Sequence, residues 1–227
     1  MTSLSDYYEG SLYPLQNGVL RAVENCKTHF FLTGGTALSR AYYHHRYSDD
    51  LDFFVNSDPD YHNQVDIIML KLQDDGFHWD ETKDFQSRDS FVSFKVYRED
   101  PEILLKLDFV NDVAPHFGDF VDTEIFDRTD SLRNMLSNKL TALYRFASKD
   151  VADIREIALH ESVNWAEIIN EARQKEAGIE LSIAADIING MPRSEFDQIH
   201  WIQNPGWDVF QSDIDKIAIQ MLRASSD

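Results

Sequence analysis

The sequence predicts an α+β fold, in which a small mixed β-sheet is flanked by helices and followed by an all-helical C-terminal part. Two observations predict it. Short apolar runs of strand length alternate with helical patterns as far as about residue 125, and from about Ser131 to the end the hydrophobic spacing is helical. Because the composition shifts between these parts, we expect a core of residues 1–127 and a helical subdomain of residues 128–227.

The N-terminal part begins with a helix and a buried strand that leads to a glycine pair. Residues 12–29 place apolar side chains at helical spacing. The short and largely apolar run 29–32 predicts a buried strand that ends just before Gly34 and Gly35. Helical spacing then returns over residues 36–45.

The central part predicts three strands and one helix. Residues 51–55 form the second apolar run, and a turn rich in Asn, Ser, Asp and Pro separates it from a helix over 61–73. Residues 91–97 alternate with period 2, and the run 103–110 returns after a further turn, so both are predicted strands. A helix over 132–146 then opens the C-terminal part.

Three carboxylates lie in or next to the predicted strands. Asp50 and Asp52 occupy positions i and i+2, which a strand presents on one face. Asp108 lies in the returning strand, where it shares a face with Lys106. A charged residue inside an apolar strand is costly unless it is paired, solvated or bound to a metal. Converging carboxylates suit Mg²⁺, which prefers oxygen ligands and often bridges to substrate phosphates.

The glycine pair is the second candidate element of a site. A Gly34-Gly35 turn that opens a helix offers bare backbone N–H groups, which suit phosphate oxygens. The alternative is an ordinary tight turn. With the acid pair, the turn would place both halves of a nucleotide site within residues 30–55.

One lysine interrupts the apolar stripe of the helix predicted over 132–146. At 100° per residue, Lys139 falls about 20° from Leu132, in the middle of that stripe. A lysine in this position must extend to solvent, pair with a local acid or meet an anionic ligand. Pairing with a local acid and binding a nucleotide phosphate are the two interpretations that we retain.

The composition excludes several classes of protein. A hydrophobic fraction of 43% and an aromatic fraction of 12% indicate a globular chain. The single Cys26 excludes an internal disulfide and suits a reducing compartment. No secretory signal precedes the first helix, and no apolar run approaches the roughly 20 residues that span a bilayer. We therefore expect a cytoplasmic protein without a membrane partner.

The charge is strongly acidic but uneven. A net charge of −19 disfavours nucleic-acid binding over the whole surface, because phosphate contacts require Lys and Arg. Residues 128–155 are the exception, with six basic and three acidic residues: Arg128, Arg133, Lys139, Arg145, Lys149 and Arg155 against Asp130, Asp150 and Asp153. We expect a polyanion to dock on this segment.

Two sequence blocks resemble the AbiEii/AbiGii toxin family of the polymerase-β-like nucleotidyltransferase superfamily. The first is Gly34-Gly35-Thr36-Ala37-Leu38 followed by HRYSDDLDF at residues 45–53. The second is NKLTALYR at residues 138–145 followed by KDVAD at residues 149–153. The first block is fairly specific, whereas a bare Asp-x-Asp would be weak. The resemblance spans roughly residues 30–155.

The resemblance implies a small nucleotidyltransferase core that transfers a nucleoside monophosphate from an NTP to an acceptor and releases pyrophosphate. It implies that Asp50 and Asp52 hold Mg²⁺, with Mn²⁺ as the alternative ion, and that Asp108 completes the site or acts as a general base. Triphosphate contacts are implied for Gly34, Gly35, Thr36, Arg46, Ser48, Lys139 and Arg145. Lys106, Asp150 and Asp153 are additional candidates, and Lys139 counts among the catalytic residues.

Three of these assignments have structural alternatives. Arg46 either complements the dipole at a helix end or contacts a phosphate. Arg145 follows Tyr144, which occupies the place where the family often has a second lysine. Asp150 either belongs to the family-like pattern or caps the helix that follows it.

Members of this family act as toxins of bacterial toxin–antitoxin or phage-defence pairs, and some modify the 3′ end of tRNA. The implied partners are an NTP, a tRNA or other RNA acceptor docked on residues 128–155, and a cognate antitoxin protein. Two alternatives stay open. One is a small-molecule nucleotidyltransferase with a cationic, aminoglycoside-like substrate, which the acidic surface suits. The other is an inactive fold used as a binding module, which the intact Asp50 and Asp52 disfavour.

Overall fold

The computed structural model describes residues 3–224, and the chain divides into two compact units. Unit 1 consists of Met1–Tyr42, Tyr47–Val113 and Phe120–Asp130, and unit 2 of Tyr43–Arg46, Ala114–Asp119 and Ser131–Asp227. Each unit is thus assembled from segments that are distant in the sequence. The assignment of a catalytic core to residues 1–127 and of a helical subdomain to residues 128–227 stays a prediction.

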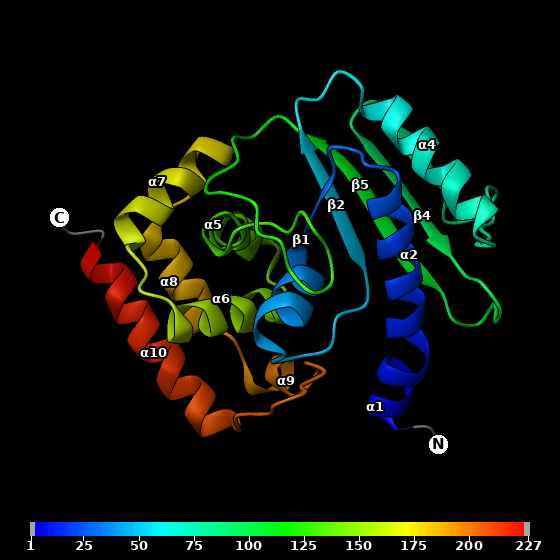
Figure 1. Ribbon diagram of the computed structural model, residues 1–227. Coiled ribbons are helices and arrows are strands. Elements are labelled where there is room, and N and C mark those ends of the chain that lie inside the picture. The colour runs from blue at the N-terminus through cyan, green and yellow to red at the C-terminus, as the bar shows by residue number, and fades with distance from the viewer. Residues whose placement is uncertain (1–2, 225–227) are drawn as a thin grey trace. The chain divides into compact units, whose positions relative to one another are not determined.

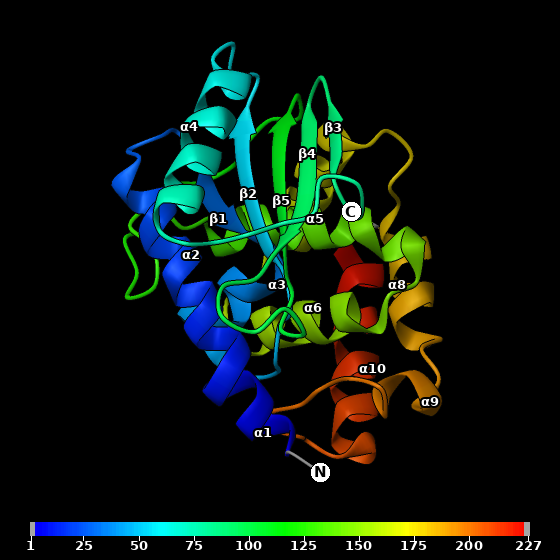
Figure 2. The ribbon, with the colours of Figure 1, turned by 90° about the vertical axis from the view of Figure 1, so that its right-hand side faces the viewer.

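Unit 1 is built on one mixed sheet (Figure 2). Within the described residues its five strands follow the order β1-β2-β5-β4-β3, with the bounds β1 Phe31–Thr33, β2 Leu51–Asn56, β3 Gln86–Arg88, β4 Phe91–Val96 and β5 Leu105–Asp112. β2 and β5 are parallel, and the other neighbouring strands are antiparallel. The predicted small mixed sheet is therefore confirmed.

The helical segments of unit 1 precede, connect and cover the strands. They are α1 Leu4–Tyr7, η1 Tyr8–Leu12, α2 Tyr13–Asn25, α3 Gly34–Thr36, η2 Ala37–Tyr43 (whose last residue belongs to unit 2) and α4 Tyr61–Asp74. The first helical run starts earlier than predicted, at Leu4, because Ser3 and Asp6 form a capping box. It ends at Asn25, since Lys27 has a left-handed φ of 50° that a helix cannot continue.

The two faces of the sheet have different environments. Phe53 and Phe109 are fully buried and stack with ring centroids 5.3 Å apart. The helices α2 and α4 cover one face of the sheet (Figure 1). The intervening residues, among them Asp52 and Asp108, lie on the opposite face and are only partly buried. The predicted alternation in both strands is confirmed, and it turns the acids away from the apolar core.

Three strand and helix boundaries differ from the sequence predictions for identifiable reasons. The sequence does not predict β3, because Gln86–Arg88 is polar and exposed and so has no alternation. The helix predicted over 36–45 starts at Gly34 and is π-helical over Ala37–Tyr43. The helix predicted over 132–146 is regular only to Ala142 and ends before Phe146, whose φ of 57° is left-handed.

Unit 2 is helical, as the sequence predicts for the C-terminal part. Its helices are α5 Leu132–Ala142, η3 Leu143–Arg145, α6 Ser148–His160, α7 Trp165–Lys175, α8 Leu181–Asn189, α9 Arg193–Phe196 and α10 Trp207–Ala224. α5 packs against α6 and α7, and α10 packs against α8 (Figure 1). Among the described residues, no helix has both the length and the apolarity needed to cross a bilayer.

Candidate active site

A row of four polar residues runs across the sheet of unit 1 and contains two of the three predicted acids. Thr33 of β1 pairs with Asp52 of β2, Asp52 with Asp108 of β5, and Asp108 with Ser93 of β4. Directly paired residues project from the same face of a sheet, and neighbouring strands lie about 4.8 Å apart. The register therefore places the Asp52 and Asp108 carboxylates side by side on the partly open face.

The third predicted acid lies next to this row. Asp50 comes one residue before β2, which starts at Leu51 as the sequence predicts. Its backbone carbonyl accepts a hydrogen bond from the Thr36 hydroxyl at 2.5 Å. Thr36 is fully buried, so it holds the chain at Asp50 in place. A triphosphate contact by Thr36 is not tested and stays a prediction.

Asp108 has two direct partners. The Ser93 hydroxyl donates to its Oδ1 at 2.6 Å, and the Lys106 ammonium donates to its Oδ2 at 2.5 Å. Burial by itself would lower the pKa of Lys106, but the bond to Asp108 and the charges of Asp108, Asp50 and Asp52 raise it. All three acids therefore act on one ammonium, which shows that they share an electrostatic environment suited to a cation.

The glycine pair approaches the acids closely. Gly34 has a φ of +74°, and a Cβ at this position would overlap the carboxylate of Asp52. A helix starts at Gly34, and its first N–H groups donate no hydrogen bond to the side chain of Thr33, the N-cap residue. Instead, the Thr33 hydroxyl donates to Asp130 at 2.5 Å. The N-terminus of this helix thus lies against Asp52 without a side-chain cap, as a phosphate site requires.

The donor set fits a hard divalent cation. Asp50, Asp52 and Asp108 offer carboxylate oxygens, the ligands that Mg²⁺ and Mn²⁺ prefer, and the Lys106 ammonium shows that a cation is accommodated at Asp108. Within residues 3–224, however, no three His, Cys, Asp or Glu side chains are gathered closely enough to hold a metal by themselves. A metal at this position stays a prediction from the donor chemistry.

Lys139 belongs to a buried ion cluster in unit 2. Its ammonium lies 2.7 Å from Asp150 Oδ1 and 2.6 Å from Asp153 Oδ2. The structure thus shows the local pairing that we retained as one of two interpretations. Burial would lower the pKa of Lys139, but the charges of Asp153 and Asp150 raise it, so the residue is cationic. Its predicted contact with a nucleotide is not tested and stays a prediction.

Two further candidates belong to the same cluster. Arg46 binds Asp153 through two parallel bonds, Nε to Oδ1 and Nη2 to Oδ2, both at 2.7 Å. Arg145 donates to Asp150 at 2.9 Å, and Asp150 does not cap α6, which has no side-chain cap. Burial would raise the pKa of Asp153, but Arg46 and Lys139 hold it well below its usual range. The predicted phosphate contacts of both arginines are not tested.

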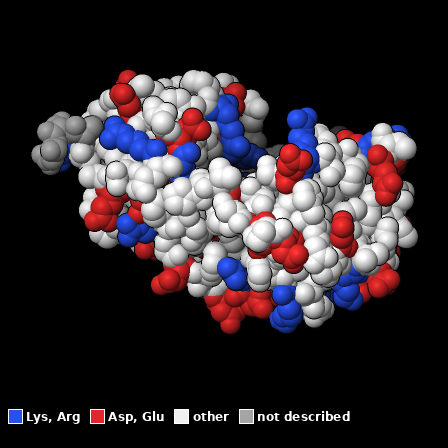
Figure 3. Space-filling view, turned by 90° about the horizontal axis from the view of Figure 1, so that it is seen from above, with Lys and Arg blue, Asp and Glu red and all other residues white. Residues whose placement is uncertain are grey.

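The basic segment 128–155 carries little unpaired charge. Four of its six cations, Arg133, Lys139, Arg145 and Arg155, are in ion pairs with acids of unit 2. In the part of the chain that the structure describes, Arg128 and Lys149 have no such pair. Figure 3 likewise shows acidic and basic side chains interspersed over one face and no large patch of one sign. Docking of RNA on the segment as a whole stays a prediction.

Sequence reasoning did not identify every residue of the site. Ser93, Thr33 and Asp130 contact or extend the carboxylate row, but only strand register reveals them. Ser48, a predicted triphosphate contact, is buried, and its backbone carbonyl accepts a hydrogen bond from Gln16 Nε2 at 3.0 Å. Its role, like that of Gly35, is not tested.

Comparisons with known proteins give a family and a fold. The family model described as nucleotidyl transferase AbiEii toxin, type IV TA system, matches residues 19–220. A search of curated protein sequences finds no match. The solved structure of JHP933 from Helicobacter pylori has a TM-score of 0.66 at 17% identity, with 99% of this chain and 94% of that chain covered. MenT4, a nucleotidyltransferase toxin from Mycobacterium tuberculosis, has a TM-score of 0.60 at 13% identity, with 99% and 90% covered.

We predict that Gly34→Ala destabilises unit 1 more than a positive φ alone explains. A Cβ at Gly34 would meet the Asp52 carboxylate, whereas Gly76 has a similar φ of +81° with nothing within 4 Å. Gly76→Ala is therefore the matched control, and it should cost about 1 kcal/mol of unfolding free energy. Gly34→Ala should cost at least about 2 kcal/mol. Equal losses in urea unfolding would show that the contact is absent.

We predict that Lys106→Met strengthens binding of Mn²⁺ about tenfold, the equivalent of about 1.4 kcal/mol. The substitution removes the cation that now neutralises Asp108, so a divalent ion would no longer compete with it. Lys95→Met is the control, because Lys95 lies opposite Lys106 in the sheet but pairs with Asp84. Electron paramagnetic resonance of free Mn²⁺ measures both affinities. Equal affinities in the two variants would contradict a cation site at Asp108.

We predict that Asp153→Asn lowers the unfolding free energy at pH 7 by about 3–5 kcal/mol, because it removes the carboxylate that binds Arg46 and one of the two that bind Lys139. The pKa of Asp153 is lowered in the folded state, so its stabilisation is present above the unfolded pKa and is lost as pH falls through the folded pKa. The deficit should shrink below about pH 4. Asp127→Asn, in an exposed pair at 3.4 Å, should change stability by less than about 0.5 kcal/mol.

Proposed function

Because this chain belongs to the AbiEii family of nucleotidyl transferase toxins, we propose that it transfers a nucleoside monophosphate from an NTP to an RNA acceptor at the carboxylate row of unit 1. The observation that carries this proposal is the in-register placement of Asp52 beside Asp108, with the helix start at Gly34 against Asp52. Acids and uncapped backbone N–H groups are the two components that a metal-bound triphosphate requires.

Asp50, Asp52 and Asp108 would hold a divalent ion, Mg²⁺ or Mn²⁺, together with oxygens of the NTP, because among the described residues the acids are not gathered closely enough to hold it by themselves. When bound, the ion supplies neutralisation of charge on the phosphate oxygens, which is the main requirement of phosphoryl and nucleotidyl transfer. The backbone N–H groups at Gly34 and Gly35 would orient the triphosphate, because the helix begins there without a side-chain cap. Thr36 would support this geometry by fixing the backbone at Asp50.

The reaction joins an acceptor oxygen to the α-phosphorus and breaks the bond to the bridging oxygen of pyrophosphate. Pyrophosphate leaves with the bonding electrons, and the acceptor hydroxyl loses its proton. Asp108 is the proposed base for that proton, or the third metal ligand, because its carboxylate faces the same side of the sheet as Asp52. Lys106, bound to Asp108, would keep a positive charge beside the reacting phosphate.

The toxin–antitoxin description of the family supports a cognate antitoxin as a partner. RNA is our proposed acceptor because the chemistry adds a nucleotide to a hydroxyl, which the 3′ end of an RNA provides. The net charge of −19 favours a cationic small acceptor instead, so an aminoglycoside is the second candidate. We propose the cytoplasm as the compartment, since NTPs and RNA are both available there.

A labelling experiment tests this function. The protein is incubated with Mg²⁺, each α-³²P-labelled NTP and either total RNA or an aminoglycoside. We expect label in RNA, and a loss of at least about 10²–10³-fold in Asp50→Asn and Asp52→Asn, because each removes a charge at the reacting centre. Asp66→Asn, at an exposed acid of α4, should retain activity. Label only in the aminoglycoside would favour the second candidate, and no transfer at all would favour the binding module.

A further inference from the structure

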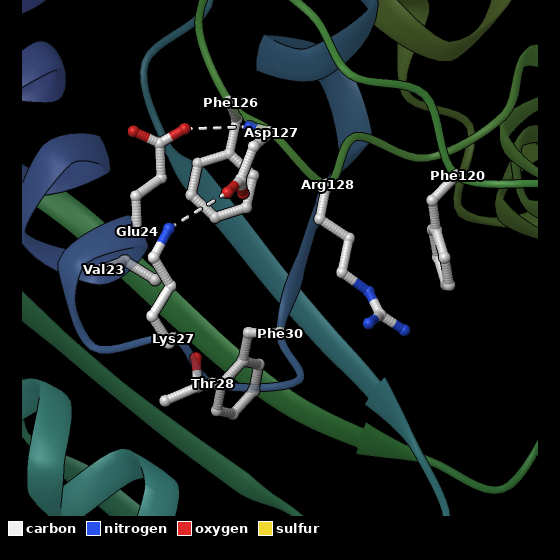
Figure 4. A pocket seen from close by; sticks show the side chains of 9 residues that line it. All are labelled: Val23, Glu24, Lys27, Thr28, Phe30, Phe120, Phe126, Asp127 and Arg128. Atoms are coloured by element: carbon white, nitrogen blue, oxygen red, sulfur yellow. Dashed lines mark hydrogen bonds and ion pairs between the residues drawn. The ribbon is translucent and has the colours of Figure 1, made fainter.

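A pocket of about 330 Å³ lies at the edge of unit 1, between the end of α2, the start of β1 and the segment 120–128 (Figure 4). This volume is at the small end of the range for ligand pockets, about 300–1,000 Å³. None of the residues that line it belongs to the carboxylate row, and every one lies in unit 1.

Arg128 is the feature of this pocket that calls for an explanation. Its guanidinium stacks on the Phe120 ring, 4.1 Å from the centroid, and its Nε is buried without a hydrogen-bond partner. Among the described residues it forms no ion pair, in a chain with 40 acidic residues. Burial lowers the pKa of Arg128, and the charge of Asp127 opposes this shift without cancelling it. Buried unpaired cations are costly, and an anionic ligand would offset that cost.

The acids near the pocket make their direct contacts with groups other than the Arg128 guanidinium, although the charge of Asp127 acts on it from a distance. Asp127 pairs with the Lys27 ammonium at 3.4 Å, and Glu24 Oε1 accepts from the Asp127 backbone N–H at 2.8 Å. Figure 4 shows these contacts on the wall opposite the Arg128 guanidinium, which points toward Phe120. Lys27, Asp127 and Glu24 thus contact one another, and the Arg128 Nε is left without a hydrogen-bond partner.

The rest of the wall is aromatic. Phe30 and Phe126 are almost fully buried and line the pocket with Phe120, which is partly exposed. A ligand that satisfies this surface combines one anionic group for Arg128 with a flat, weakly polar body for the rings. A nucleotide unit has both parts, since guanidinium groups bind phosphates and bases stack on aromatic and arginine side chains.

Backbone hydrogen bonds connect this pocket to the carboxylate row. The Leu32 N–H donates to the Arg128 carbonyl at 3.0 Å, and the Asp130 N–H donates to the Leu32 carbonyl at 2.8 Å. Asp130 in turn accepts from Thr33, which is in register with Asp52. Phe30 precedes Thr33 by three residues, about 10 Å of extended chain. A nucleotide in the pocket would therefore lie along β1 from the proposed reaction centre.

We propose that this pocket binds one nucleotide of the acceptor RNA, with its phosphate on Arg128 and its base or ribose against the phenylalanines. The site rests on the proposed function for the identity of the acceptor. It is distinct from the NTP-binding residues, and it explains why Arg128 stays unpaired while four of the other cations of the segment 128–155 are in ion pairs.

Binding of a fluorescein-labelled RNA hexanucleotide, followed by anisotropy, tests the site in the full-length protein without NTP. Arg128→Met should weaken RNA binding at least about fivefold. It should also reduce the slope of log affinity against log salt concentration by about one ion. Arg128→Lys should restore part of the affinity, because it restores the charge without the planar fork. Arg98→Met is the matched control, since Arg98 stacks on Phe77 at 5.4 Å, is exposed and lies outside the pocket. It should bind RNA like the parent protein.

Two further measurements separate a binding role from a structural one. Arg128→Met should leave the Tm unchanged or raise it, because it removes a partly buried cation whose Nε has no hydrogen-bond partner. A lowered Tm with unchanged RNA affinity would overturn the proposal. Phe120→Leu should weaken RNA binding with an unchanged salt slope, since it removes ring contact and no charge. An unchanged affinity in this variant would contradict the aromatic part of the site.

Competitors identify the source of the ligand. Unlabelled UMP and AMP test whether the ligand is a free mononucleotide. If they displace the labelled RNA at micromolar concentration, the pocket recognises a nucleotide but takes it as a free molecule. Displacement by hexaglutamate as effectively as by RNA would overturn the proposal in favour of an acidic peptide.

Loss of RNA binding in Arg128→Met supports the site even if no NTP is turned over. Nucleotidyl transfer to RNA that is unaffected by Arg128→Met would retain the proposed function and refute the site.

Discussion

The in-register parallel pairing of β2 with β5 is the constraint on which the rest of the site depends. It places Asp52 directly beside Asp108, although 55 residues of chain separate them. Neighbouring carboxylates repel each other, so the fold retains this register only because the opposite face is apolar and buried, with Phe53 stacked on Phe109. A slip by one residue would reverse both faces and place the acids in the core. The hydrophobic core thus enforces an electrostatic arrangement that would be unfavourable by itself.

The two units manage their buried charges in different ways. In unit 2, Asp153 is neutralised by Arg46 and Lys139 through close, buried ion pairs. These pairs hold the segment Tyr43–Arg46 against α5 and α6. In unit 1, Asp108 binds the Lys106 ammonium directly, and the charges of Asp50 and Asp52 also raise the pKa of Lys106. Three acids that act on one cation form an environment that favours positive charge, and this is the basis of the metal site proposed in unit 1.

Residues near the site illustrate what pattern analysis could and could not predict. The alternation in β2 and β5 predicted correctly that Asp52, Lys106 and Asp108 turn away from the core, because a strand has period 2. Helical spacing identified Lys139 as anomalous but left two interpretations, since the acids that bind it come from another helix. The helix at Gly34 starts two residues earlier than predicted, because glycine is a weak helix former that hydrophobic spacing does not mark.

By itself, the sequence determined the mixed α+β class, the helical C-terminal part and the family, because these depend on hydrophobic period and on a contiguous motif. Only the tertiary structure decided which charges meet. Coulomb interactions act through space, so charge pairing depends on strand register and helix packing. Register brings Ser93 to Asp108, and packing brings Asp153 to Arg46. The same packing leaves the Arg128 Nε without a hydrogen-bond partner. The count of six cations in residues 128–155 was correct, but their availability to an anionic partner was decided by contacts that no local pattern encodes.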